Sequence, residues 1–378
     1  MRTHDIGLKI VKNDKGELGF AFYTGGGQGR TPIIGPLVKG FVAKEDLLSY
    51  LDATLRVYNM HGRRDNIYKA RIKILVKAIG PEEFARQVET EWVHAKDSPT
   101  VLTDAEYARV AAHFTSPAYE KLPNIEPRYI EALADSRAFS QWTQRNVHAH
   151  RVDGYCAVTL SLKKPGVPPG DATADQMDFV ADLADRFSFA ELRVSHEQNL
   201  ILADVRKRDL FELWLAAKSQ GLATPNIGLL TNIVCCPGGD FCSLANAKSI
   251  PVAQAIQERF DDLDYLHDIG ELDLNISGCM NSCGHHHIGH IGILGVDKNG
   301  SEWYQVSIGG AQGTKAALGE VIGPSFAAAD VPDVISQLID TYVAIRLEDE
   351  PFVDTVHRVG IAPFKSRVYA EPRAVAHA

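Results

Sequence analysis

The sequence predicts an α+β protein with mixed sheets and flanking helices, in which one module occurs twice around a different unit. Two observations support this prediction: an internal repeat, and a run of strand and helix patterns between its two copies. The chain has 378 residues, of which 45% are hydrophobic and 23% are charged, and this composition is typical of a folded chain of two or three domains. A disordered chain would be poorer in apolar residues and more strongly charged.

The repeat consists of two glycine-rich loops separated by a constant 284 residues. The matching residues are Gly25, Gln28 and Gly29 in the first copy and Gly309, Gln312 and Gly313 in the second. The second copy follows a long segment that holds five of the six cysteines, whereas the first copy lies close to Met1. We therefore expect the chain to begin inside the first module, although a copy that evolved a shorter front would leave the same pattern.

Hydrophobic periodicity predicts the elements of the first copy. Residues 6–12 and 18–24 are typical of the two strands of a hairpin. Apolar residues then recur at helical spacing over 47–58 and 72–79, so helices are expected after the glycine loop. Residues 81–150 contain several prolines and short helical patterns, and they are expected to form a helical or irregular linker.

The segment after this linker shows a different order of elements. A strand over 156–162, a helix near 174–187, a strand pair around 196–198 and a helix near 206–220 give the order β-α-β-β-α. This order suggests a ferredoxin-like unit. The remaining residues, from 226 onward, then form the second, cysteine-bearing module.

Charge and hydropathy exclude several classes of function. The net charge of −9, from 39 basic and 48 acidic residues, argues against a large nucleic-acid surface because phosphate binding needs clustered positive charge. No apolar run approaches the roughly 18 residues of a membrane span, and the first residues lead into a strand rather than a signal sequence. We therefore expect a cytoplasmic protein that binds neither nucleic acid nor membrane. Disulfides are rare in that compartment, so the six cysteines need another explanation.

Two cysteine pairs carry the clearest chemical signal. Cys236 and Cys242 are separated by five residues, and Cys279 and Cys283 by three. Four thiolates are the usual ligand set of an iron–sulfur cluster. Zinc sites prefer cysteines two to four residues apart, which fits the second pair but not the first. A cluster, a zinc ion and coincidentally buried thiols are the alternatives, and the spacing favours the cluster.

The two pairs, Asn281 inside the second pair and the glycine-rich strand region after it resemble the sulfite/nitrite reductase hemoprotein family. The resemblance implies a [4Fe-4S] cluster bound by all four cysteines, and a siroheme whose iron shares the thiolate of Cys283. It also implies the six-electron reduction of sulfite to sulfide or of nitrite to ammonia, with electrons from a ferredoxin or an NADPH-dependent flavoprotein. The implied domains are 1–80, a remnant of the first siroheme-fold module; 81–150, the linker; 151–225, a ferredoxin-like half-domain; and 226–378, the cluster and siroheme module.

Siroheme carries eight carboxylates, and a densely basic segment offers partners for them. The residues that lie where the family has siroheme-contacting basic residues are Arg63, Arg64, Arg71 and Lys73. Such a run is also typical of a solvated helix face. Gly25 and Gly26 belong to a loop whose backbone amides can approach carboxylates closely, and a tight hairpin would have the same glycines.

Three further features are weaker. Histidines 285–287 follow shortly after Cys283, and consecutive residues of a strand alternate faces, so all three cannot converge on a zinc ion. Exposed or simply packed histidines are favoured, and a proton relay by one of them near a cofactor is the alternative. The turn at Gln198 resembles a family turn near the cofactor, although an ordinary hairpin turn would look the same. Cys156 and Cys235 are expected to be ordinary buried thiols.

In one respect the chain departs from the family. Family members bind the substrate oxyanion with arginines and lysines that mostly lie in the first half, and the matching stretch would precede His4. We therefore expect an N-terminally truncated or split reductase whose isolated chain is impaired in catalysis. The alternative is a non-catalytic iron–sulfur subunit that transfers electrons or acts as a scaffold without siroheme.

Overall fold

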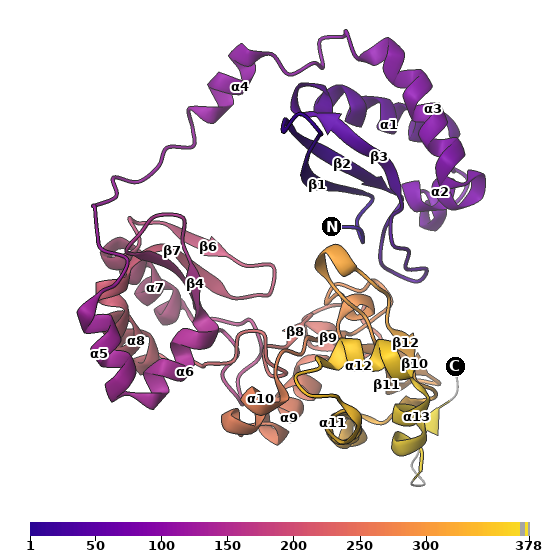
Figure 1. The fold of residues 1–378 in the computed structure, drawn as a ribbon. Helices are drawn as coiled ribbons and strands as arrows, with labels where there is room; N and C mark the ends of the chain where they lie inside the picture. The colour runs from indigo at the N-terminus through magenta and orange to yellow at the C-terminus, as the bar shows by residue number, and fades with distance from the viewer. Residues whose placement is uncertain (371–374, 377–378) are drawn as a thin grey trace. The chain divides into compact units, whose positions relative to one another are not determined.

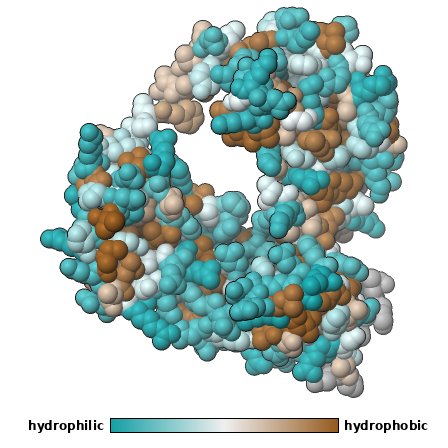
Figure 2. Space-filling view, viewed as in Figure 1, coloured by the Kyte–Doolittle hydropathy of each residue, from teal (hydrophilic) through white to brown (hydrophobic). Residues whose placement is uncertain are grey.

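The computed structural model describes residues 1–370 and the strand Val375–Ala376. The described chain divides into two compact units (Figure 1). The first contains Met1–Ser116 together with Ala311–Leu318, and the second contains Pro117–Gly310 and the chain from Gly319 onward. Hydrophilic side chains cover most of the visible surface of each unit, with hydrophobic groups scattered among them (Figure 2). No helix in the described part of the chain is long and apolar enough to cross a membrane.

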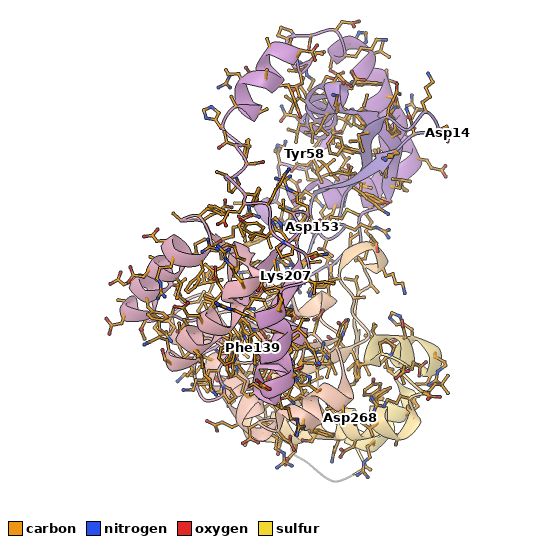
Figure 3. All side chains as sticks on the ribbon, turned by 60° about the vertical axis from the view of Figure 1, so that its left-hand side comes forward. Asp14, Tyr58, Phe139, Asp153, Lys207 and Asp268 are labelled. Atoms are coloured by element: carbon orange, nitrogen blue, oxygen red, sulfur yellow. The ribbon has the colours of Figure 1, made fainter. Side chains whose placement is uncertain are left out.

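The first unit is built on a three-stranded antiparallel sheet. Its strands, in the order β1-β2-β3, are β1 (Ile6–Lys12), β2 (Leu18–Thr24) and β3 (Leu37–Ala43). Its helices are α1 (Leu47–His61), α2 (Ile72–Ile79), α3 (Pro81–Ala95) and α4 (Asp104–Ala111). Phe22 of β2, Tyr50 of α1 and Phe84 of α3 share one buried core. Asp14 marks the turn between β1 and β2 (Figure 3), so the predicted hairpin is confirmed, as are the two predicted helices.

The second unit contains two sheets, and the first of these is four-stranded and antiparallel. Its strands, in the order β4-β5-β7-β6, are β4 (Val147–Ala149), β5 (Tyr155–Leu160), β7 (Leu200–Arg206) and β6 (Leu192–Val194). Its helices are α5 (Pro127–Asp135), α6 (Arg137–Asn146), α7 (Ala174–Phe187) and α8 (Leu210–Ser219). Phe139 of α6, labelled in Figure 3, lies in the core between this sheet and the helices. The order β5-α7-β6-β7-α8 confirms the predicted β-α-β-β-α pattern.

The other sheet of the second unit is mixed. Three parallel strands, β8 (Val234–Cys235), β9 (Leu274–Ser277) and β10 (Ile291–Lys298), are followed by antiparallel β11 (Ser301–Ile308). The short strands β12 (Glu320–Val321), β13 (Ser325–Phe326) and β14 (Val375–Ala376) extend the sheet beyond β11. The helices are α9 (Ile250–Arg259), α10 (Leu263–Ile269), α11 (Val331–Ile345), α12 (Phe352–Val359) and α13 (Ala362–Val368). Because β8 and β9 are parallel neighbours, the loops that follow them leave the same edge of the sheet.

The repeat predicted from the glycine loops is present in the structure. Helices α1 and α11 each contain 15 residues and begin 284 residues apart. Gly25 and Gly309 share the left-handed backbone region, with φ of 85° and 84°, so the two loops make the same turn. An isolated β-bridge inside each loop recurs at the same spacing. The copies differ at one edge: β10 lies between β9 and β11, whereas β1 is an edge strand among the described residues.

The segment 81–150 differs from the predicted linker because much of it packs into the two units. Helix α3 packs against α1, and α6 contributes to the core of the four-stranded sheet. Pro81 and Pro127 stand at the first positions of α3 and α5. Proline is favoured there because the first helical N–H groups have no partner within the helix, so these prolines start helices rather than break them.

Candidate metal-cluster site

Two loops at the carboxyl ends of β8 and β9 carry the four predicted metal ligands. Cys236 follows directly on β8, and its N–H donates to the carbonyl of Ile276 in β9 (3.1 Å). Cys279 lies just beyond the end of β9, and the same loop continues to Cys283. The parallel pairing of β8 and β9 therefore brings the two halves of the cysteine motif to one edge of the sheet.

Glycines allow the two cysteine loops to touch through their backbones. A Cβ atom on Gly278 would lie 2.8 Å from the Cα atom of Gly238 and 2.6 Å from the carbonyl oxygen of Ala247. The N–H groups of Asn246 and Ala247 both donate to the carbonyl of Gly278 (2.8 and 3.0 Å). The loop of the first cysteine pair is thus fastened to the backbone immediately before the second pair.

The four thiols share one neighbourhood. Partial desolvation raises the pKa of the Cys283 thiol, and the negative charges of the Cys236, Cys279 and Cys242 thiolates act in the same direction. Cys236 and Cys279 are buried, Cys242 is half-buried and Cys283 is exposed. Across the described residues, no three His, Cys, Asp or Glu side chains converge closely enough to hold a single metal ion. The pairing of β8 with β9 thus places all four thiols on two adjoining loops.

Hydrogen-bond donors surround the first cysteine of the motif. The N–H of Gly278 donates to Sγ of Cys236 (3.1 Å), and the hydroxyl of Ser249 lies 3.5 Å from the same sulfur. Hydrogen bonds to ligand sulfurs tune the reduction potential of an attached cluster.

The other two cysteines have a different environment. Cys156 and Cys235 are 2% and 3% exposed. Burial raises the pKa of the Cys156 thiol to about 12, and burial likewise raises the pKa of Cys235. Both stay protonated at neutral pH, which confirms the prediction of ordinary buried thiols.

Side chains of β9 fasten the loop of the second cysteine pair. The Ser277 hydroxyl accepts the N–H of Gly284 (3.1 Å), and the Asn275 amide donates to the carbonyl of Gly284 (2.8 Å). Asn281, predicted to contact the cofactor, remains exposed in the same loop, as does Cys283. The exposed groups of the loop are therefore presented by a backbone that is anchored from within the sheet.

The histidines after the fourth cysteine lie in a helical turn, so the prediction of a strand was wrong. Residues 286–288 form one turn of 3-10 helix, because Ser282 and His285 adopt left-handed φ values of 60° and 57° that reverse the chain. His286 is buried, its Nδ1 lies 3.1 Å from the Ser282 hydroxyl, and its ring centroid is 3.9 Å from that of His287. Burial, followed by the charges of the two neighbouring histidines, lowers the pKa of His286 to about 3. The imidazole is therefore neutral at pH 7.

In the first unit, the predicted cofactor residue Lys73 supports the glycine loop. Its side chain reaches from the start of α2, and its ammonium donates to the carbonyls of Gln28 (2.7 Å) and Thr31 (2.8 Å). The residue is 5% exposed, and burial is the main cause of a lowered pKa. The Lys73 ammonium therefore forms these hydrogen bonds with the backbone of the glycine loop.

Arg71 and the glycines lie close to this lysine. The Arg71 guanidinium pairs with Asp5 (2.8 Å), and a Cβ atom on Gly27 would lie 2.9 Å from its Nη2. A Cβ on Gly25 would meet Val76 at 2.8 Å, and one on Gly26 would lie 2.1 Å from a backbone carbonyl oxygen. The two predicted glycines are therefore required for packing within the unit.

Arg63 and Arg64 occupy a different loop, between α1 and α2. Arg63 forms an ion pair with Asp65, and its side chain is 44% exposed. The Arg64 guanidinium lies 4.7 Å from the ring centroid of Tyr58. Of the four predicted cations, the structure therefore brings Arg71 and Lys73 to the glycine loop and leaves the other two on a separate loop.

We expect Lys73→Met to destabilise the first unit by about 1–3 kcal/mol, because two carbonyls that the ammonium now satisfies would lose their donor. Lys77→Met is the matched control, since Lys77 lies one turn later on α2 and is exposed. Chemical denaturation of the two variants measures the difference. Equal free energies of unfolding would show that the ammonium does not support the loop.

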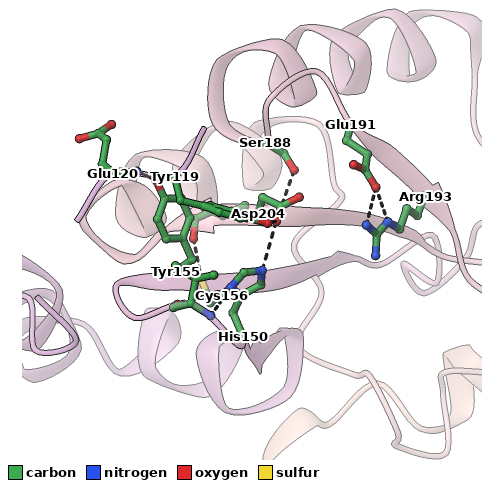
Figure 4. A network of polar contacts seen from close by, with 11 residues as sticks. Tyr119, Glu120, His150, Tyr155, Cys156, Ser188, Glu191, Arg193 and Asp204 are labelled. Atoms are coloured by element: carbon green, nitrogen blue, oxygen red, sulfur yellow. Dashed lines mark hydrogen bonds and ion pairs between the residues drawn. The ribbon is translucent and has the colours of Figure 1, made fainter. Parts of the chain in front are cut away.

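The sequence pattern did not reveal a polar cluster in the ferredoxin-like unit (Figure 4). Asp204 of β7 is 3% exposed, accepts a hydrogen bond from the Tyr119 hydroxyl (2.6 Å) and lies 3.1 Å from Nε2 of His150. Nδ1 of His150 accepts the N–H of Val152 (2.9 Å). Both ring nitrogens are engaged, so this cluster fastens the segment before α5 to the sheet.

A second group that the sequence pattern did not reveal lies nearer the cysteines. Lys163, three residues beyond the end of β5, is 0% exposed. Its ammonium donates to the carbonyl of Ile233, directly before β8. One feature of the sequence could have indicated this lysine: it follows an apolar strand, and a charged residue in such a place is rarely buried without a specific partner.

Comparison with protein families assigns both parts of the repeat to one family description. "Nitrite and sulphite reductase 4Fe-4S domain" matches residues 1–96 and 228–375. "Nitrite/Sulfite reductase ferredoxin-like half domain" matches residues 148–220, which contain the β-α-β-β-α unit.

Individual relatives cover nearly the whole chain but only part of their own length. The assimilatory ferredoxin-dependent nitrite reductase of Haloferax mediterranei is 27% identical over 380 residues, which cover 98% of this chain and 60% of the relative. A ferredoxin sulfite reductase of Mycolicibacterium paratuberculosis is 26% identical, with 94% of this chain and 59% of the relative covered. The structure of the Mycobacterium tuberculosis NirA protein matches with a TM-score of 0.73 at 24% identity, over 96% of this chain and 61% of that one, and therefore has the same fold.

Proposed function

The chain belongs to the nitrite and sulphite reductase family, and from this premise we propose that it serves the six-electron reduction of sulfite to sulfide or of nitrite to ammonia. Relatives are named as ferredoxin-dependent nitrite and sulfite reductases, so the proposed electron donor is a ferredoxin and the proposed substrate a small oxyanion. The chain spans about 60% of the length of the Haloferax relative. The six-electron reduction is therefore proposed as the activity of an enzyme that has the full length of these relatives.

The proposed cofactor ligands are the four cysteines of the two adjoining loops. The observation that supports them is that the parallel strands β8 and β9 bring both cysteine loops to one edge of the sheet, where the N–H of Gly278 donates to Sγ of Cys236 and the N–H groups of Asn246 and Ala247 donate to the carbonyl of Gly278. The four proposed ligands of a [4Fe-4S] cluster are Cys236, Cys242, Cys279 and Cys283. When bound, the cluster supplies single electrons and a siroheme supplies an iron that binds the oxyanion.

The surroundings of Cys236 and Cys283 differ, and this difference suggests different roles for the two ligands. The Gly278 N–H donates to the sulfur of the buried Cys236 and the Ser249 hydroxyl lies 3.5 Å from it, so this sulfur has hydrogen-bond partners from the chain itself. Cys283 is the exposed member of the four, so its sulfur is the one open to a second iron. We therefore propose Cys283 as the thiolate shared with siroheme.

The basic residues of the first unit are proposed to act in two ways. The side chains of Arg63 and Arg71 are 44% and 41% exposed, and Arg64 is exposed as well. These three arginines are proposed to meet carboxylates of the macrocycle. Lys73 is proposed to hold the loop of Gly25 and Gly26 in the shape that presents its amides. Asn281 is proposed as a further contact because it lies exposed between Cys279 and Cys283.

Spectra of the chain loaded without oxygen test this proposal. After assembly with iron and sulfide and addition of siroheme, we expect the chlorin-like visible bands of siroheme to remain with the protein through gel filtration. Cys283→Ser is expected to change these bands, whereas Cys156→Ala, at a buried cysteine of the ferredoxin-like unit, leaves them as in the parent. A chain that holds a cluster but no siroheme would contradict the reductase function and favour an electron-transfer subunit.

A further inference from the structure

Lys163 is a buried cation next to the loop of the first cysteine pair. It is 0% exposed, and its ammonium donates to the carbonyl of Ile233 (2.8 Å) and to Oε1 of Gln198 (3.1 Å). No carboxylate of the described residues forms an ion pair with it. Burying an ammonium is costly unless hydrogen bonds and an opposite charge compensate. The carbonyl and amide supply the hydrogen bonds, and the carboxylates of Glu197 and Asp171 act on the ammonium without forming an ion pair with it.

Gln198 extends the contact of this lysine to the cysteine loop. Its Nε2 donates to the carbonyl of Cys235 (2.7 Å), and its Oε1 accepts the N–H of Cys235 (2.9 Å). Both backbone polar groups of the residue before Cys236 are therefore held by one side chain. Gln198 has a left-handed φ of 59°, and the Ser195 hydroxyl fixes this turn by accepting the N–H groups of its neighbours, Glu197 and Asn199.

Buried asparagine side chains also hold the backbone around Lys163 and Gln198 in place through hydrogen bonds. The Asn199 side chain accepts the N–H of Leu162 (3.0 Å) and donates to the Asn232 side chain (3.0 Å). The Asn226 amide donates to the carbonyl of Lys163 itself (3.0 Å). The backbone on both sides of the contact is thus fixed, so the ammonium of Lys163 is held at one place relative to the cysteine loop.

We propose that Lys163 is a positioning residue that, with Gln198, holds the backbone leading into Cys236 and places a fixed positive charge beside the cluster. This inference rests on the proposed function of the four cysteines. A cluster with its thiolates is anionic and gains one more negative charge on reduction, so a buried positive charge stabilises the reduced form more than the oxidised form. Lys163 therefore raises the reduction potential of the cluster.

The protonation of Lys163 agrees with this role. Burial lowers the pKa of its ammonium to about 8, while the charges of the Glu197 and Asp171 carboxylates act in the opposite direction. The side chain is therefore mostly protonated at pH 7. An anionic cluster close by would favour the protonated form further.

Redox titration of the chain loaded with its cluster tests the proposal. At a fixed applied potential, Lys163→Met is expected to raise the ratio of oxidised to reduced cluster at least tenfold. For a one-electron couple, this change corresponds to a fall of about 59 mV in the reduction potential of the cluster. Lys163→Arg is expected to keep the potential near that of the parent, because the charge remains. Lys164→Met is the matched control, since Lys164 is the adjacent residue, carries the same charge and is exposed. Should the methionine variant not fold, Lys163→Gln removes the charge and retains a hydrogen-bond donor.

Gln198→Asn separates the hydrogen-bonding role from the charge. Asparagine tolerates left-handed φ but is too short to reach Cys235. We expect this variant to release iron to a chelator several-fold faster than the parent while its potential stays close to that of the parent. If Lys163→Met and Lys164→Met both hold the cluster and have the same reduction potential, the inference is wrong and the proposed function stands. A parent chain that holds no cluster overturns both.

Discussion

Cys236→Ser is expected to abolish assembly of the metal cluster, whereas Cys235→Ala is expected to leave it intact. The two cysteines are adjacent, yet Cys236 begins the loop at the edge of the sheet and receives a hydrogen bond from Gly278, while Cys235 ends β8 inside the core. A thiolate is the ligand for iron, and a serine hydroxyl is a poor replacement. The visible charge-transfer absorption after anaerobic loading with iron and sulfide measures the result. The same loss is expected for serine at Cys242 and Cys279.

The control separates ligation from folding. Cys235→Ala removes a buried sulfur and costs stability through packing, about 1 kcal/mol or somewhat more. A folded Cys235→Ala chain should therefore take up as much iron as the parent. Equal iron uptake by Cys236→Ser and the parent would show that Cys236 is not a ligand. Equal loss from both variants would show that the effect is structural.

Gly284→Ala is expected to disrupt both cysteine loops at once. A Cβ at this position would lie 1.9 Å from the carbonyl oxygen of Ile276, far inside contact distance. That same carbonyl accepts the N–H of Cys236, so any shift that relieves the clash moves the first cysteine loop as well. Overpacking of this kind costs about 1–3 kcal/mol, and backbone atoms have less freedom to move than a side chain. We expect a lowered free energy of unfolding together with reduced iron uptake.

Gly40→Ala provides the matched control in the first unit. Gly40 lies in β3, its backbone is not in the left-handed region, and a Cβ there would have no atom within 4 Å. Its free energy of unfolding should remain within about 0.5 kcal/mol of the parent. Thermal or denaturant unfolding of both variants, with iron analysis of the loaded proteins, measures the two effects. A Gly284→Ala chain that is as stable as Gly40→Ala and holds full iron would contradict the packing of the two loops.

Local pattern predicted those parts of the fold that depend on neighbouring residues. The hairpin of β1 and β2 and helix α2 were predicted at the residues where they occur, because alternation and helical spacing each reflect one buried face. The spacing of the glycine loops predicted the repeat of α1 and α11, because a left-handed turn requires glycine at the same place in each copy.

The parts that depend on distant contacts could not be predicted in this way. Pro127 was expected to act as a helix breaker, whereas in the structure it is the first residue of α5, which packs against α6. Residues 286–288 turn because of left-handed residues before them, which the sequence of three histidines does not indicate. The role of Lys163 depends on Ile233, 70 residues away in the chain.

The most direct test of this account is the metal content of the chain loaded with iron and sulfide under anaerobic conditions and then freed of excess reagents. The account predicts four iron atoms and four inorganic sulfides for each chain, lost together when Cys236 is replaced by serine and retained when Cys235 is replaced by alanine. One tightly held metal ion with no inorganic sulfide, or no retained metal at all in a folded chain, would contradict it.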